Sequence, residues 1–249
     1  MKLLEVCVDS LESARNAIAG GADRLELCAA LSVGGLTPSA ALLRQIRGES
    51  DIPVRCLMRP RAGDFLYTPE ERSLMVMQME ALKAAGANGF VIGCLTKDGE
   101  LDGEALQPLL QAAEGCGLTL HRCIDVSKDP LAAYRAAWAL GMDTVLTSGG
   151  AASCLQGEKT LASLLELQAA GGPTVLIGAG VNADTIHRLG SRYPNARAFH
   201  MSGKRDKPSG MVFRREGVPM GIPGLDEWHI AVTGTEAIQK ARHALNSLA

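Results

Sequence analysis

Aromatic residues are scarce in this chain of 249 residues, at 4% of the total, so its core must be built from aliphatic side chains and alanine. An excess of charge of one sign is also lacking, because 25 Lys and Arg residues face 27 Asp and Glu residues, a net charge of −2. That balance argues against a general nucleic-acid binder, which normally carries a basic excess. No run approaches the roughly 18 consecutive apolar residues of a membrane-spanning helix. With 47% hydrophobic and 21% charged residues, the composition is that of an ordinary globular protein.

The cysteines lack the even number and regular spacing of a disulfide framework. There are seven of them, scattered and mostly inside apolar runs: Cys7, Cys28, Cys56, Cys94, Cys116, Cys123 and Cys154. The first nine residues contain an apolar run that Glu5 breaks, so the uninterrupted apolar stretch of a secretory signal peptide is missing. We therefore expect a cytoplasmic protein with reduced thiols.

Short β-type runs alternate with longer helical patterns along the whole chain, and no shift in composition marks a domain boundary. The predicted strands are 3–8, 24–29, 54–59, 90–95, 118–124, 144–147, 174–177 and 198–202. The predicted helices are 11–19, 38–47, 69–85, 103–113, 130–140, 160–170, 183–192 and 235–248. Eight such units and this length favour a single (β/α)8 TIM barrel over 1–249, rather than an open doubly wound sheet.

The segment 204–233, between the last strand and the last helix, is unusually long for a loop. Loops of this length are usually functional or make contacts. Its apolar residues Met211, Phe213 and Trp228 would lie in water if the segment were free. We expect it to be ordered, either covering the barrel mouth or lying in a subunit interface.

Two predicted strands each carry a glutamate and a cysteine two residues apart. Glu5 shares a strand face with Cys7, and Glu26 shares one with Cys28, because side chains alternate along a strand. A carboxylate does not suit the apolar layer under the helices, so we expect both pairs to point into the barrel near its carboxyl end, where such barrels hold their sites. The plainer alternative is that the glutamates are paired internally and the cysteines fill the core.

Further polar residues lie at the ends of other predicted strands. His121 and Cys123 share a face, which Asp125 continues, and this set could supply acid–base groups or metal ligands. His200 and Ser202 share a face of the last predicted strand. For His121, the alternative is a hydrogen-bonded structural histidine.

Two groups of residues suit an anion. Arg59 and Arg61 stand beside a glycine-containing turn and could bind a carboxylate or phosphate, or could form an ion pair with Asp64 that fixes the loop. Gly180 and Gly203 follow the last two predicted strands, where backbone N–H groups of such barrels often bind phosphate. Tight turns at these places need glycine in any case.

The assembled stretches resemble the CutC copper homeostasis family. They run in order over most of the chain: 5–10 (EVCVDS), 22–28 (ADRLELC), 34–39 (GGLTPS), 59–65 (RPRAGDF), 118–122 (LTLHR), 145–150 (VLTSGG) and 200–202 (HMS). The resemblance implies a (β/α)8 barrel, a cytoplasmic location and a homo-oligomer, with a dimer favoured. It also implies copper handling, with Cu(I) bound by Cys7 and Cys28.

Two functions stay open at this point. The first is copper homeostasis, with Cu(I) on thiolates at the barrel mouth, since a soft ion prefers thiolate ligands. The second is an enzyme acting on a small anionic or phosphorylated substrate by acid–base or divalent-metal chemistry. Its candidate catalytic residues are Glu5, Glu26, His121, Asp125 and His200. Its candidate anion-binding residues are Arg59, Arg61, Gly180, Ser202 and Gly203.

Overall fold

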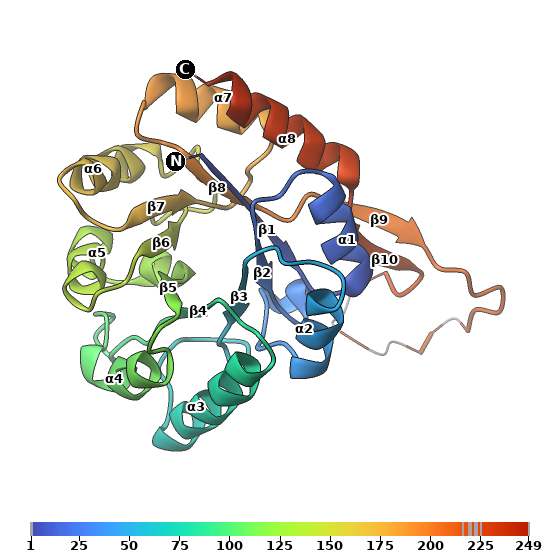
Figure 1. The fold of residues 1–249 in the computed structure, drawn as a ribbon, viewed down its shortest axis with the longest axis horizontal. Coiled ribbons are helices and arrows are strands. Elements are labelled where there is room, and N and C mark those ends of the chain that lie inside the picture. The colour runs from blue at the N-terminus through green and yellow to red at the C-terminus, as the bar shows by residue number, and fades with distance from the viewer. Residues whose placement is uncertain (1, 216, 219–220, 222–223, 225, 249) are drawn as a thin grey trace.

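The chain folds as a closed barrel of eight parallel strands, seen in a computed structural model that describes residues 2–248 apart from 216, 219–220, 222–223 and 225 (Figure 1). The strands follow one another around the barrel in sequence order, and β8 pairs with β1 to close it. Their bounds are β1 Leu3–Val8, β2 Arg24–Leu27, β3 Val54–Leu57, β4 Gly89–Ile92, β5 Gly117–Leu120, β6 Thr144–Thr147, β7 Thr174–Ile177 and β8 Ala198–Met201. The prediction of a (β/α)8 TIM barrel is confirmed.

Helices surround the barrel and alternate with its strands: α1 Leu11–Ala19, α2 Ala40–Arg47, α3 Pro69–Ala84, α4 Gly103–Ala112, α5 Pro130–Ala139, α6 Glu158–Ala169, α7 Ala183–Arg192 and α8 Thr235–Ser247. Helix α8 packs against α7 and α1, so the last helix lies beside the first (Figure 1). Helix α2 begins two residues later than predicted, because the Ser39 hydroxyl accepts a hydrogen bond from the Leu42 N–H and so caps the first turn.

Alternate residues of each strand face the helices or the barrel interior. On β1, Leu4, Val6 and Val8 join the main apolar core under the helices. The inward face of β1 runs Leu3, Glu5 and Cys7, so a carboxylate lies between two apolar positions. The polar groups around Glu5 in the barrel interior lie beneath the candidate functional site described below.

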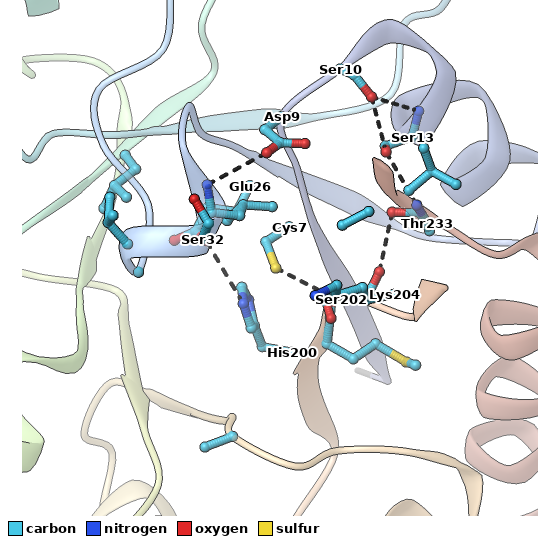
Figure 2. A pocket seen from close by; sticks show the side chains of 18 of the residues that line it. Cys7, Asp9, Ser10, Ser13, Glu26, Ser32, His200, Ser202, Lys204 and Thr233 are labelled. Carbon is cyan, nitrogen blue, oxygen red and sulfur yellow. Dashed lines mark hydrogen bonds and ion pairs between the residues drawn. The ribbon is translucent and has the colours of Figure 1, made fainter. Parts of the chain in front are cut away.

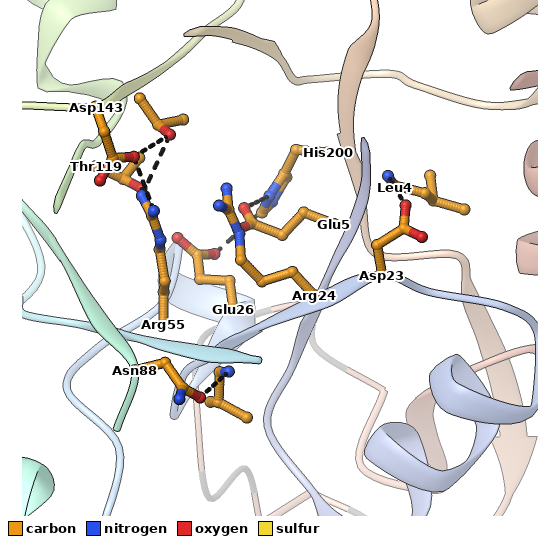
Figure 3. A network of polar contacts seen from close by, with 12 residues as sticks. Leu4, Glu5, Asp23, Arg24, Glu26, Arg55, Asn88, Thr119, Asp143 and His200 are labelled. Carbon is orange, nitrogen blue, oxygen red and sulfur yellow. Dashed lines mark hydrogen bonds and ion pairs between the residues drawn. The ribbon is translucent and has the colours of Figure 1, made fainter. Parts of the chain in front are cut away.

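Two arginines cross the barrel interior beside that carboxylate. Arg24 pairs with Glu5, and Arg55 reaches Thr119 Oγ1 at 2.6 Å and the Asp143 carboxylate at 2.7 Å (Figure 3). Gly89 and Gly117 leave the space for Arg55, because a Cβ atom at Gly117 would lie 2.5 Å from its Nη2 atom. Asp143 precedes β6, so Arg55 ends at the face of the barrel opposite the mouth.

Two regions differ from the prediction. Strand β5 ends at Leu120 instead of continuing to 124, because His121 Nδ1 accepts a hydrogen bond from the Cys123 N–H and starts a 3-10 turn over Arg122–Val126. The long segment 204–233 contains an antiparallel hairpin, β9 Lys204–Pro208 with β10 His229–Thr233. The predicted order of this segment at 216, 219–220, 222–223 and 225 lies outside the described residues.

A helix that crosses a lipid bilayer must be both long and apolar. Within the described part of the chain, no helix combines the length and the apolar character that crossing it would require.

Candidate functional site at the barrel mouth

A cavity of about 1570 Å³ opens at the carboxyl ends of the strands. Cys7, Glu26 and His200 lie on its inner wall, and the hairpin contributes rim residues that include Lys204, Asp206 and His229 to Thr233 (Figure 2). The part of the 204–233 segment that the structure describes therefore borders the mouth.

Three different donor types converge inside this cavity. Ligand atoms of Cys7, Glu26 and His200 all lie within 4.8 Å of one another. The register explains the meeting: Cys7 lies opposite Glu26 on β2, and the closure of the barrel brings His200 of β8 beside Glu5 of β1. Cys7 is 8% exposed, so the cluster is buried but reached from the cavity.

The two cysteines that the sequence analysis pairs both face the interior and share an apolar cluster with Leu57 and Val91. Cys28 lies behind Glu26, with its Sγ 3.4 Å from Glu26 Oε2. It is 1% exposed, and burial, aided by the charge of Glu26, raises the pKa of its thiol well above the usual range. Cys28 therefore needs to lose a proton before it can serve as a thiolate ligand.

Glu5 is the fully buried anchor of the cluster. Its carboxylate accepts hydrogen bonds from Arg24 and from His200 Nδ1, the latter at 2.9 Å (Figure 3). Burial alone would raise its pKa, but the Arg24 charge and the His200 hydrogen bond lower that pKa to about 2. A charged Glu5 places the Nδ1 proton of His200 between the two groups and leaves Nε2 facing Glu26 at 3.7 Å.

The pKa values of the remaining two members of the cluster, Glu26 and His200, are both raised. Burial, with a contribution from the Glu5 charge, raises the pKa of Glu26 against the opposing effect of His200. Burial works to lower the pKa of His200, but Cys7, Glu26 and Glu5 together raise it well above its ordinary value. Proton-sharing groups of this kind are typical of functional sites.

His121 and Asp125 also line the cavity but lie in the turn after β5, not on a strand. The Asp125 carboxylate accepts hydrogen bonds from Thr147 Oγ1 at 2.5 Å and from the Ser148 and Gly150 N–H groups at 3.0 Å, and it pairs with Arg122 at 2.7 Å. These contacts fix the turn after β6, and they occupy the carboxylate. His121 is the freer of the two groups.

The anion-binding candidates separate into those at the cavity and those away from it. Arg59, Gly180 and Ser202 line it. Arg61 does not, because it pairs with Glu71 at 2.6 Å and with Asp64 at 3.0 Å, which is the ion pair weighed as its alternative. Gly203 is also absent from the lining, and a Cβ there would lie 2.5 Å from Ile238 Cδ1, so helix packing requires this glycine.

Arg24 and Arg55 are site residues that the sequence analysis missed. Arg24 has the same strand parity as Glu26 and Cys28, so the argument that turned those residues inward applies to it as well. For Arg55, the signal was a pair of glycines, Gly89 and Gly117, at the starts of the two following strands, which makes room for a long side chain.

Comparisons with known proteins agree on one family. The sequence model of the CutC family matches residues 2–204. A family protein CutC of Vibrio campbellii is 44% identical over 245 residues, which cover 98% of each chain. The copper homeostasis protein cutC homolog of Homo sapiens is 40% identical over 250 residues, 99% of this chain and 89% of that protein. A crystal structure of CutC from Streptococcus agalactiae matches with a TM-score of 0.75 at 27% identity, over 81% of this chain and 99% of that one.

Proposed function

This chain belongs to the CutC family, and we propose that it binds Cu(I) at the inner wall of the mouth cavity through Cys7 and Cys28. His200 is the further ligand. The observation that carries the proposal is the meeting of the Cys7, Glu26 and His200 donor atoms within 4.8 Å of one another. Copper here is cargo that the protein handles.

The donor set suits a soft ion. Thiolate and imidazole are the ligands that Cu(I) prefers, and the carboxylate of Glu26 is the least suited of the donors. Two donors on opposite sides of one ion lie about 4–4.6 Å apart when each metal–ligand bond is about 2.0–2.3 Å. The spacing of Cys7 and His200 therefore supports one ion without a movement of the barrel strands, and Cys28 Sγ lies next to this pair, 3.4 Å from Glu26 Oε2.

His200 is oriented for this role by its neighbours. Glu5 accepts the hydrogen bond from Nδ1 at 2.9 Å, which leaves the other ring nitrogen for the ion. A carboxylate behind a ligating histidine fixes the ring and makes it a better donor, and losing such support typically costs about 10–100-fold in metal affinity. Arg24 in turn keeps Glu5 charged.

An anaerobic titration with Cu(I) against a chromogenic chelator tests the proposal. We expect one tight site per chain, abolished by Cys7→Ser because an alcohol is a poor ligand for a soft ion. Cys28→Ser and His200→Gln are expected to weaken it. Cys56→Ser is the matched control, since Cys56 is equally buried but belongs to the core under the helices. Unchanged affinity in Cys7→Ser, with the fold intact, refutes the site.

A second candidate function is an enzyme acting on a small anionic substrate. The size of the cavity favours it, because about 1570 Å³ is far more than one ion occupies. In that function Glu26 and His200 are the acid–base pair, Glu5 orients His200, and Arg59 binds the anion. Glu26→Gln separates the two functions: it leaves a thiolate copper site in place but removes one of the acid–base groups.

Two features implied by the resemblance stay predictions: a cytoplasmic location and a homo-oligomer, with a dimer favoured. Exposed apolar side chains of Met211, Val212 and Phe213 beyond β9 support association through this segment. Light scattering on the full chain measures the oligomer, and charged substitutions at Val212 and Phe213 are expected to reduce it.

A further inference from the structure

Two buried hydrogen-bond donors without partners lie on the β3–β5 side of the mouth cavity. Among the described residues, five buried side-chain nitrogen or oxygen atoms have no hydrogen-bond partner. Two of the five, His121 Nε2 and Arg59 Nε, belong to residues that line the cavity. Buried polar groups are nearly always paired, so two orphans beside one cavity point to a missing ligand.

The proton of His121 lies on the unpaired nitrogen. Nδ1 accepts the hydrogen bond from the Cys123 N–H at 3.2 Å, so it cannot carry the proton of a neutral ring. The ring is 4% exposed, and burial lowers its pKa to about 3, which is consistent with a neutral imidazole. His121 Nε2 is therefore an N–H donor with no acceptor.

Arg59 contributes a second donor and a positive charge. Its two terminal nitrogens donate to the carbonyl oxygens of Val33, Gly35 and Gly63 at 3.0–3.1 Å, which fixes the guanidinium in place. Nε–H is left over. Within the described part of the chain, these side-chain partners of Arg59 are all backbone carbonyls, in contrast to Arg61, which pairs with the carboxylates of Glu71 and Asp64.

Phe65 lies against both residues. Its ring centre is 4.8 Å from that of His121 and 5.3 Å from the Arg59 guanidinium carbon. Phe65 is half-buried and also lines the cavity. The three side chains therefore form one continuous part of the cavity wall.

We propose that His121 and Arg59 form a binding site for a small oxyanion, a carboxylate or phosphate group, which enters from the mouth cavity. The site offers donors and a positive charge, which match the acceptor-only oxygens of an oxyanion. It is separate from the Cys7 and His200 cluster, so it does not depend on copper binding.

Calorimetry on the copper-free full chain, with inorganic phosphate and acetate as separate probes, measures the binding. A paired substitution compares an N–H donor with a carboxylate at this position. The side chains in His121→Asn and His121→Asp can both accept the Cys123 N–H, but only Asn offers an N–H toward the cavity. We expect affinity within several-fold of wild type for His121→Asn and a loss of about tenfold or more for His121→Asp, because one charge-assisted hydrogen bond is lost and the new carboxylate repels the oxyanion. Arg61→Lys is the control and is expected to bind as wild type.

Nitrogen-edited spectra of ¹⁵N-histidine-labelled protein supply an independent readout, since the oxyanion should shift the His121 Nε2–H signal. Binding of either probe with this pattern supports the site and identifies the preferred group. Equal affinities for the Asn and Asp variants, no binding of either probe, or binding that leaves the His121 signal unmoved overturns it. Thermal unfolding of each variant without probe confirms that the compared proteins are folded.

Discussion

Replacing Glu5 by glutamine removes the one fully buried charge on which the candidate site is built. Glu5 is 0% exposed and accepts hydrogen bonds from Arg24 and His200. Its pKa falls from an ordinary 4.5 to about 2 in the folded protein. At 1.36 kcal/mol per unit, this shift corresponds to about 3 kcal/mol of stability at neutral pH. Breaking one partner of a buried ion pair gives a similar value, roughly 3–5 kcal/mol.

The contribution of the Glu5 charge to the free energy of unfolding depends on pH. Because the folded pKa is the lower one, the stabilisation is complete above pH 4.5 and is lost as the pH falls toward 2. The gap between wild type and Glu5→Gln should therefore be about 3 kcal/mol at pH 7 and about 1 kcal/mol at pH 3. A protonated Glu5 and a glutamine are nearly the same group.

Urea denaturation followed by circular dichroism, at several pH values, measures this gap. Glu49→Gln is the matched control, because Glu49 also pairs with an arginine, Arg15, but on the surface with side chains 41% and 60% exposed. We expect no measurable change there, since water and salt screen exposed pairs. A Glu5→Gln variant as stable as the Glu49→Gln control, or a gap that does not change between pH 7 and pH 3, refutes this account of Glu5.

Three further predictions test other parts of the structure. The His121 ring should stay neutral until close to pH 3, because burial lowers its pKa to about 3; a proton NMR titration midpoint near 6.5 contradicts this. Gly93→Ala should cost about 1–3 kcal/mol in denaturation, because its Cβ would lie 2.5 Å from Cys123 Sγ, whereas Gly210→Ala meets nothing within 4 Å and should be neutral. The Cys56 thiol, whose pKa burial raises to about 12, should resist alkylation at pH 8 until the protein unfolds; rapid labelling of the native chain, read by mass spectrometry, is the contrary result.

The sequence predicts the barrel well because its strands and helices differ in period. Strands β1, β6 and β7 have the predicted bounds, and most other elements differ by a few residues at their ends. The error at β5 has a local cause. The alternating pattern continues through His121, Cys123 and Asp125, but a side-chain hydrogen bond to the backbone ends the strand first.

For the candidate site, the alternation of side chains along each strand predicts which residues face the barrel interior, but not which of them meet. Parity turns Glu5, Cys7 and Glu26 inward, and the structure places them there. It does not give the register between strands, which decides that Glu26 rather than Cys28 lies opposite Cys7. Nor does it place His200 beside Glu5, since that contact exists only because β8 closes onto β1.

The Arg55 side chain fills the barrel interior at the end opposite the mouth. Its guanidinium fills the space that Gly89 and Gly117 leave, and it ends on Asp143 at the face away from the mouth. If Cys7 binds an ion as proposed, that ion enters and leaves through the mouth. Transfer of the proposed ion to a recipient would then be an exchange of ligands at the mouth, in which the recipient's donor atoms pass the β9–β10 hairpin. The hairpin, which borders the mouth, would then determine which recipients can reach the ion.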